Sequence, residues 1–257
     1  GGKDAIDSAA KLLSKAKFPV ILSGAGVVLG GAINECKKLA EKLDAPVCNG
    51  YQHNDSFPGS HPLAVGPLGY NGSKAAMELI SKADVVLALG TRLNPFSTLP
   101  GYGVDYWPKN ATIIQVDMNP DRIGLTKKVT VGICGDSKQV AQQIIDKLSV
   151  DAGDTGREER KNLIHKTKSA WLQTLSGLDH EEDDPGTVWN KEARERDKDR
   201  VSPRQAWRAI QDGMPEDVII SSDIGNNCAI GNAYPTFEKP RKYLAPGLFG
   251  PCGYGFP

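Results

Sequence analysis

Residues 84–90 read Asp-Val-Val-Leu-Ala-Leu-Gly, a run of strand length whose five central residues are all apolar. A strand that is apolar on both faces is typical of a parallel sheet covered by helices, because a strand with one wet face would alternate apolar and polar residues. Residues 73–82, just before the run, place apolar side chains at helical spacing. The run therefore predicts an α/β fold.

The same alternation of helix and strand extends in both directions from this run. Helices are predicted over residues 4–17, 32–43 and 137–148, and strands over residues 20–22, 46–48, 112–117 and 129–133. Residues 23–26, Ser-Gly-Ala-Gly, are expected to form a tight turn after the first strand. Alternating strands and helices predict a doubly wound parallel sheet of nucleotide-binding type in residues 1–150.

The composition changes after residue 150. Residues 151–200 are rich in charges of mixed sign, which is typical of a solvated connecting helix or loop, and we interpret them as a linker. Ser202-Pro203 then opens a predicted helix, because proline is favoured at the first helical position, and a strand follows at residues 218–223. Residues 201–257 are thus expected to begin a second α/β domain. The first residue is not Met and the last residues form a Gly/Pro-rich loop, so we expect sequence to continue beyond both ends.

Composition excludes several classes of function. Lys plus Arg and Asp plus Glu each number 31, so the formal net charge is zero and neither a nucleic acid nor an anionic membrane surface is an expected partner. The apolar runs are far shorter than the roughly 20 residues that cross a bilayer. The five cysteines are scattered without a CxxC pair, which favours a reducing cytoplasm over a disulfide framework or a zinc site.

A candidate nucleotide-like site follows from residues at predicted strand ends. Gly24 and Gly26 follow the first strand, Arg92 follows the strand of residues 84–90, and Asp117 ends another. Ligands of α/β sheets bind at this edge, where small residues let backbone N–H groups approach a phosphate, while Arg92 could pair a diphosphate and Asp117 a ribose hydroxyl. The spacing departs from GxGxxG, and ordinary strand-end turns with a structural ion pair are the alternative.

Two histidines lie in the loop after residue 50. His53 and His61 could serve as metal ligands or as a general base. The prolines and glycines around them favour a long ordered loop instead. Cys36, on the inner face of a predicted helix, is expected to be a buried small apolar residue.

The C-terminal segment carries a second candidate site. Asp223-Ile224-Gly225-Asn226-Asn227 follows a predicted strand directly and offers a glycine and two amide side chains, as a diphosphate site requires. Residues 247–255 form a glycine-rich loop whose backbone could touch a planar ligand. Plain surface loops are the alternative.

Four longer strings resemble one enzyme family. They are residues 66–72 (GPLGYNG), 89–95 (LGTRLNP), 116–124 (VDMNPDRIG) and 222–228 (SDIGNNC). These strings are similar to those of thiamine-diphosphate-dependent enzymes of the acetohydroxyacid synthase superfamily, and most of all to those of its sulfoacetaldehyde acetyltransferase family. The resemblance covers nearly the whole chain outside the linker.

The resemblance implies thiamine diphosphate and Mg²⁺ as cofactors, with residues 1–150 as the middle domain and residues 201–257 as the first part of the diphosphate-binding domain. The implied reaction converts sulfoacetaldehyde and phosphate to acetyl phosphate and sulfite through a carbanion of the cofactor. The reactive group thus belongs to the cofactor, and the protein binds and orients it. It also implies a cytoplasmic homodimer or homotetramer.

Residue roles carry over from the resemblance position by position. Gly225, Asn226 and Asn227 match positions that line the diphosphate, and Gly250 and Cys252 match positions around the aminopyrimidine and beneath the thiazolium ring, where relatives commonly carry a bulkier apolar residue than Cys252. Arg92 and Asp117 match positions near FAD in relatives such as acetohydroxyacid synthase, although the sulfoacetaldehyde acetyltransferase family is not expected to need FAD.

Two parts that the family requires are expected outside this sequence. The activating glutamate would precede Gly1 and the segment that holds Mg²⁺ would follow Pro257, so no metal ligand is assigned within the chain and the chain alone should be inactive. The alternatives are another carboligase or decarboxylase of the superfamily, such as acetolactate synthase, and a non-catalytic nucleotide-binding module. A nucleotide-binding module would not explain the pattern of residues 223–227 or the glycine-rich loop around Gly250.

Overall fold

The computed structural model describes residues 2–101, 103–149, 156–179, 200–246 and 250–255. Residues 151–155 and 180–199 of the expected linker, and residues 247–249 of the glycine-rich loop, lie outside the described residues. In the described part of the chain no helix is long and apolar enough to cross a membrane.

Six parallel strands form the central sheet. In chain order they are β1 (Pro19–Ser23), β2 (Val47–Asn49), β3 (Ala64–Pro67), β4 (Val85–Leu89), β5 (Thr112–Asp117) and β6 (Val131–Cys134). Their spatial order is β3-β2-β1-β4-β5-β6, so the chain moves outward from β1 in one direction and then crosses back to β4 on the other side of β1. This reversal of direction confirms the predicted doubly wound α/β fold.

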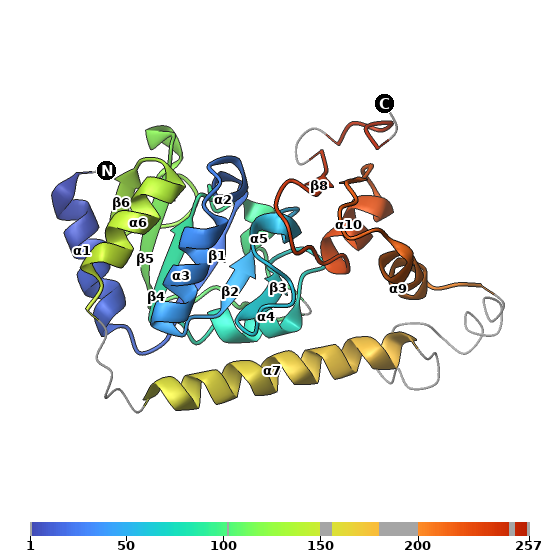
Figure 1. Cartoon of the computed structure of the whole chain (residues 1–257), viewed down its shortest axis with the longest axis horizontal. Coiled ribbons are helices and arrows are strands. Elements are labelled where there is room, and N and C mark those ends of the chain that lie inside the picture. The colour runs from blue at the N-terminus through green and yellow to red at the C-terminus, as the bar shows by residue number, and fades with distance from the viewer. Residues whose placement is uncertain (1, 102, 150–155, 180–199, 247–249, 256–257) are drawn as a thin grey trace.

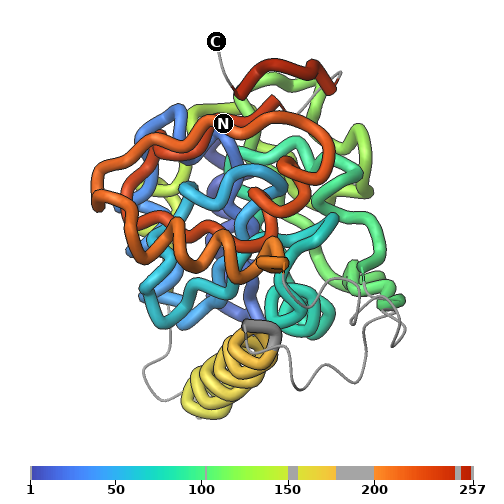
Figure 2. The backbone as a smooth tube through the Cα atoms, turned by 90° about the vertical axis from the view of Figure 1, so that its right-hand side faces the viewer, coloured from blue at the N-terminus to red at the C-terminus, as the bar shows by residue number. Residues whose placement is uncertain are grey.

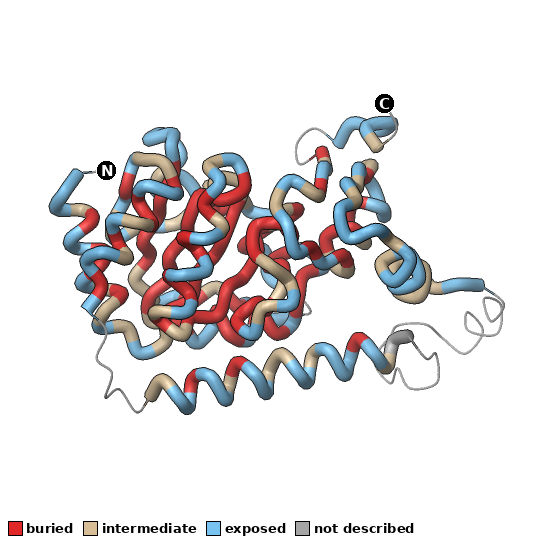
Figure 3. Tube along the Cα trace, viewed as in Figure 1, coloured by how far each residue is buried: buried red, intermediate tan, exposed pale blue. Residues whose placement is uncertain are grey.

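Helices cover both faces of the sheet. Helices α1 (Lys3–Lys15), α3 (Ile33–Leu43) and α6 (Ser137–Lys147) lie side by side on one face (Figure 1). Helix α4 (Lys74–Ile80) connects β3 back to β4, and the right-handed crossover rule places it on the opposite face. Every residue of β1 and β4 is buried between these layers, and Figure 3 shows the buried positions concentrated along the central strands.

The structure differs from the sequence analysis at two places in this part of the fold. Strand β3 was not predicted. It tolerates Pro67 because it is an edge strand, whose open side needs no hydrogen-bond donor. The turn expected over residues 23–26 is shorter: Ser23 ends β1, Gly24 is the N-cap of helix α2 (Ala25–Leu29), and Gly26 lies inside that helix.

Residues 200–246 form a smaller part beside the sheet, in front of it in the view of Figure 2. Its elements are α9 (Pro203–Gly213), β7 (Ile220–Ser221), α10 (Asn226–Ala233) and β8 (Tyr243–Leu244), and β7 pairs with β8 in parallel. Pro203 is at the first helical position of α9, as predicted, and Ser202 caps the helix in a capping box with Gln205. The strand expected over residues 218–223 is reduced to the two residues of β7.

Helix α7 (Gly156–Asp179) occupies the described part of the expected linker. It runs along the sheet in Figure 1, at the edge where the strands begin. Its Arg160 is only 5% exposed, although the charged run of residues 157–161 was expected to be solvated. The Arg160 guanidinium donates to the backbone oxygens of Lys17, Leu43 and Asp44 at 2.5, 2.9 and 3.0 Å.

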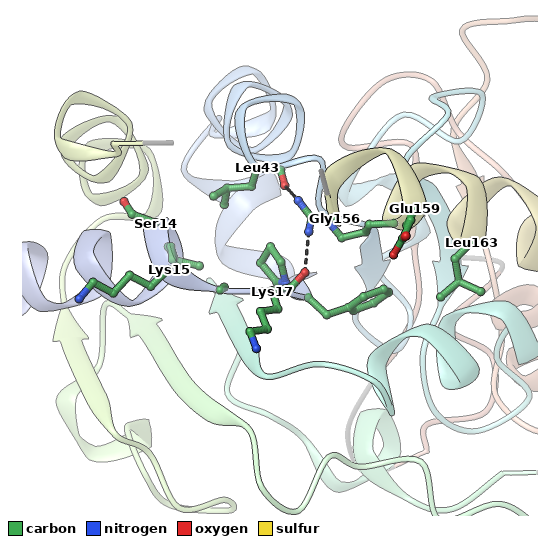
Figure 4. Close-up of a pocket in the computed structure, with 12 residues that line it drawn as sticks. Ser14, Lys15, Lys17, Leu43, Gly156, Glu159 and Leu163 are labelled. Carbon is green, nitrogen blue, oxygen red and sulfur yellow. Dashed lines mark hydrogen bonds between the residues drawn. The ribbon is translucent and has the colours of Figure 1, made fainter. Parts of the chain in front are cut away.

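These bonds cross a surface hollow of about 670 Å³ between α7 and the sheet. Figure 4 shows Lys17 and Leu43 on one side of the hollow and Glu159 and Leu163 of α7 on the other, with dashed lines for the bonds to Lys17 and Leu43. A buried cation is favourable here because carbonyl oxygens at helix C-terminal ends carry partial negative charge. Arg160 therefore fastens α7 to the ends of α1 and α3.

Replacing Arg160 by Leu should lower the free energy of unfolding by about 3 kcal/mol, because three buried carbonyl oxygens would lose a charged donor. Urea unfolding would measure this loss. The control is Lys161→Gln, which removes an exposed ion pair with Glu158 and should cost less than about 0.5 kcal/mol. Equal losses for the two variants would contradict the anchoring role of Arg160.

Candidate functional site

The turns after β1 and β4 are pressed together at the carboxyl edge of the sheet. Gly26 donates its N–H to the carbonyl oxygen of Gly90 at 2.8 Å. A Cβ atom at Gly24 would lie 2.6 Å from that same oxygen and 2.6 Å from Cβ of Thr91. These glycines therefore permit a contact between neighbouring turns, a packing role in addition to the phosphate approach that the sequence suggested.

A cavity of about 620 Å³ opens beside these turns. It lies where β1 and β4 diverge into opposite crossovers, which is where ligands of doubly wound sheets bind. Its lining includes two arginines and two aspartates, so its formal charge is balanced: Arg92, Arg122, Asp117 and Asp136. Of the four residues of the predicted nucleotide-like site, Gly26, Arg92 and Asp117 line this cavity, and Gly24 lies just behind the Gly90 turn.

The two aspartates of the cavity accept hydrogen bonds from backbone N–H groups. The Asp117 carboxylate accepts from the backbone N–H of Asn119 at 2.9 Å, and the Asp136 carboxylate caps α6 by accepting from Lys138 and Gln139. The ion pairs among the described residues do not include one between Arg92 and Asp117. Both residues line the cavity.

His53 and His61 lie in different surroundings. His53 lines the cavity, and burial is the main effect that lowers its pKa. The negative charge of Asp55 partly offsets this by raising the pKa, and the positive charge of Arg92 lowers it slightly further. His61 is 3.3 Å from the Glu41 carboxylate and packs edge-on against Phe57. Within the described ranges no three His, Cys, Asp or Glu side chains gather as a metal site.

Sequence reasoning missed the loop after β2 as part of the cavity. Gly50, Tyr51 and Gln52 line it together with His53, and the backbone N–H of Tyr51 donates to the Ser97 hydroxyl at 2.9 Å. Its position in the sequence could have indicated this role, because the loop follows the carboxyl end of β2, the strand next to β1. Asp136, two residues beyond β6, carries the same signal.

The second candidate site is at the start of α10. Gly225 has a φ of +84° and no side chain caps the helix after it, while Asn226 and Asn227 are exposed. The backbone N–H of Gly253 donates to the Asp223 carboxylate at 2.9 Å, and a Cβ atom at Gly250 would lie 3.4 Å from the Ile224 side chain. Residues 250–255 of the glycine-rich loop therefore lie beside residues 223–227, and Cys252 is exposed there.

The other described cysteines differ in burial. Cys36 is fully buried, as predicted, and burial raises its pKa to about 12. Cys48 and Cys228 are also buried, whereas Cys134 is exposed. A reagent in solution can therefore reach Cys134 and Cys252 more readily than the three buried thiols.

Comparison with known proteins identifies the family of the sheet domain. The model of the thiamine pyrophosphate enzyme central domain matches residues 6–144, which is more than half of the chain and extends from α1 into α6. The chain belongs to the thiamine pyrophosphate enzyme family. The central domain of this family therefore contains the whole six-stranded sheet and the cavity-lining residues that lie before residue 144.

Individual members of the family match all or nearly all of the chain. A probable sulfoacetaldehyde acetyltransferase of Rhizobium meliloti is 77% identical over 257 residues, which are 100% of this chain and 44% of that protein. A sulfoacetaldehyde acetyltransferase of Roseovarius nubinhibens is 74% identical over 100% of this chain and 43% of that protein. A probable acetolactate synthase large subunit of Methanocaldococcus jannaschii is 30% identical over 98% of this chain and 40% of that protein. The chain thus spans less than half the length of these curated family members.

Proposed function

We propose that the chain is part of a thiamine-diphosphate-dependent acyltransferase that converts sulfoacetaldehyde and phosphate to acetyl phosphate and sulfite. The observation that carries this proposal is the identity of 77% and 74% to proteins named as sulfoacetaldehyde acetyltransferases, against 30% to an acetolactate synthase subunit. In this proposal the substrates are small molecules and the protein acts as a cytoplasmic homodimer or homotetramer.

The proposed domain division follows the same family. Residues 1–150 are the middle domain, residues 151–200 connect the two domains, and residues 201–257 begin the diphosphate-binding domain. The fastening of α7 to the first domain by Arg160 supports a connection with a defined path rather than a loose tether.

The residues at the start of α10 fit a diphosphate. The first N–H groups of a helix have no partner within the helix, and the glycine and two exposed amides at this helix start leave them accessible. Gly225, Asn226 and Asn227 would therefore hold the phosphate oxygens, while Gly250 and Cys252 would lie beside the rings. When bound, thiamine diphosphate supplies the nucleophilic carbon and the electron sink of the reaction.

Mg²⁺ is part of the proposal, but no ligand set for it exists among the described residues. The nearest carboxylate, Asp223, already accepts from the backbone N–H groups of Ile224 and Gly253. We therefore assign no residue of the chain to the metal and derive no step through it.

Sulfite release tests the proposed reaction. The full-length protein, supplied with thiamine diphosphate, Mg²⁺ and phosphate, should release sulfite from sulfoacetaldehyde, whereas pyruvate should be a poor donor. Conversion of pyruvate to acetolactate without sulfite release from sulfoacetaldehyde would contradict the proposed substrate and favour an acetolactate synthase.

A further inference from the structure

The loop after β2 joins the sheet domain to α10 through buried polar contacts. The backbone N–H of Gln52 donates to Oδ1 of Asn232 at 2.7 Å, and the Gln52 side-chain amide donates to Sγ of Cys228. The Tyr51 hydroxyl lies 3.1 Å from the same sulfur. Cys228 and Asn232 are four residues apart, so they share one face of α10, and Gln52 contacts both.

These contacts are withdrawn from water. The exposed fractions are 4% for Gln52, 2% for Cys228 and zero for Asn232. Asn232 also donates its side-chain amide to the backbone oxygen of Tyr70 at 2.9 Å, so both ends of that amide are used. Buried polar groups of this kind specify one geometry, because any displacement leaves a donor or an acceptor unpaired.

The backbone of Gln52 is itself in an uncommon conformation. Its φ is +62°, in the left-handed region that residues with a side chain seldom adopt. Such a conformation persists only where the surroundings impose it, and here it aims the Gln52 N–H and side chain at the same helix. The strained backbone of Gln52 thus allows both its N–H and its side chain to contact α10.

The face of α10 that contacts Gln52 adjoins the proposed diphosphate site at residues 225–227. Cys228 is the third residue of the helix and follows Asn227, while residues 225–227 are exposed. Gly225 supplies no side-chain cap, and the Ser222 hydroxyl donates to the Asn227 backbone oxygen at 3.5 Å. On the buried side of the helix, Gln52 and Tyr51 contact Cys228, which directly follows Asn227.

We propose that Gln52, assisted by Tyr51, is a positioning residue that holds the start of α10 in the geometry needed to bind the diphosphate of the cofactor. The inference rests on the proposed function for the identity of the cofactor, but not for the substrate. Because Tyr51 and Gln52 also line the cavity of the sheet domain, the same loop links that cavity to the cofactor site.

The test compares Gln52→Met with Glu238→Gln in the full-length protein. Glu238 accepts from the backbone N–H and the hydroxyl of Ser60, so it also joins the two parts of the chain, but it is exposed and does not touch α10. Calorimetry should give a dissociation constant for thiamine diphosphate about tenfold higher in Gln52→Met and unchanged in Glu238→Gln. A second readout is the rate at which a thiol reagent labels the Cys228 peptide without cofactor, which should rise in Gln52→Met alone.

A purely structural role would lower the thermal midpoint of Gln52→Met without changing its cofactor affinity or the labelling of Cys228, and that result would overturn the proposal. Tyr51→Phe, which removes only one hydroxyl, should show the same two changes at smaller size if Gln52→Met fails to fold. Neither readout requires turnover. Weakened cofactor binding in a protein that releases no sulfite would contradict the proposed reaction while supporting the positioning role.

Discussion

Replacing Gly90 by Ala should lower the free energy of unfolding by about 2–5 kcal/mol, because the new methyl group meets both a strained backbone and a filled space. The φ of Gly90 is +62°, and its added Cβ would lie 2.7 Å from the Cα of Gly26. The atom in the way belongs to the backbone of α2, which cannot move without opening the contact between the two turns. Urea unfolding of the variant would measure the loss.

The matched control is Gly124→Ala. Gly124 has a φ of +76°, yet nothing lies within 4 Å of its added Cβ, so only the backbone strain applies, at about 1–2 kcal/mol. The difference between the two variants measures the contact between the β1 and β4 turns. No difference would mean that these turns are not pressed together in solution.

Replacing Cys252 by Asp in the full-length protein should weaken thiamine diphosphate binding about hundredfold, because like charges brought together cost several kcal/mol. The neighbouring Gly253 N–H is bonded to the Asp223 carboxylate, so a new carboxylate at residue 252 would lie near that charge and near the proposed diphosphate. Cys252→Asn, which has the shape of Asp without the charge, and Cys252→Leu, which is bulkier but apolar, should retain binding.

Calorimetry on the three Cys252 variants separates charge from shape. If Cys252 is only a solvent-facing thiol of the loop, the Asp variant will bind the cofactor normally, and a thiol reagent will label Cys252 equally fast with and without cofactor. Either outcome would remove Cys252 from the proposed site.

Much of the sheet could be predicted from the sequence because its central strands are unambiguous. Residues 85–89 are apolar without interruption, and a run of that length between a predicted helix and Gly90 is typical of a strand buried on both faces. The strand at residues 112–117 was predicted with its observed bounds, although its apolar residues are interrupted by Gln115.

The elements that were missed depend on contacts distant in sequence. Strand β3 contains Gly66 and Pro67, which locally favour a loop, and it is a strand because it pairs with β2 at the edge of the sheet. Helix α10 contains three asparagines and a glycine, which are poor helix formers, and its contacts with residues 51–54 contribute to its stability.

The candidate sites were predictable to a similar degree. Position at the ends of predicted strands was enough to select Gly26, Arg92 and Asp117, which the structure brings to one cavity. Nothing local marks Gln52, because its importance lies in a left-handed backbone and in partners about 180 residues away in the sequence. The roles of Gly225, Asn226, Asn227, Gly250 and Cys252 stay predictions.

The most direct test of the proposed function is the amount of acetyl phosphate formed for each sulfite released by the full-length protein. With sulfoacetaldehyde, phosphate, thiamine diphosphate and Mg²⁺, the two products should appear in equal amounts, and neither should appear when the cofactor is left out. Sulfite released without acetyl phosphate, or at an unchanged rate without thiamine diphosphate, would contradict the assignment of an acyltransferase that passes its acetyl group to phosphate.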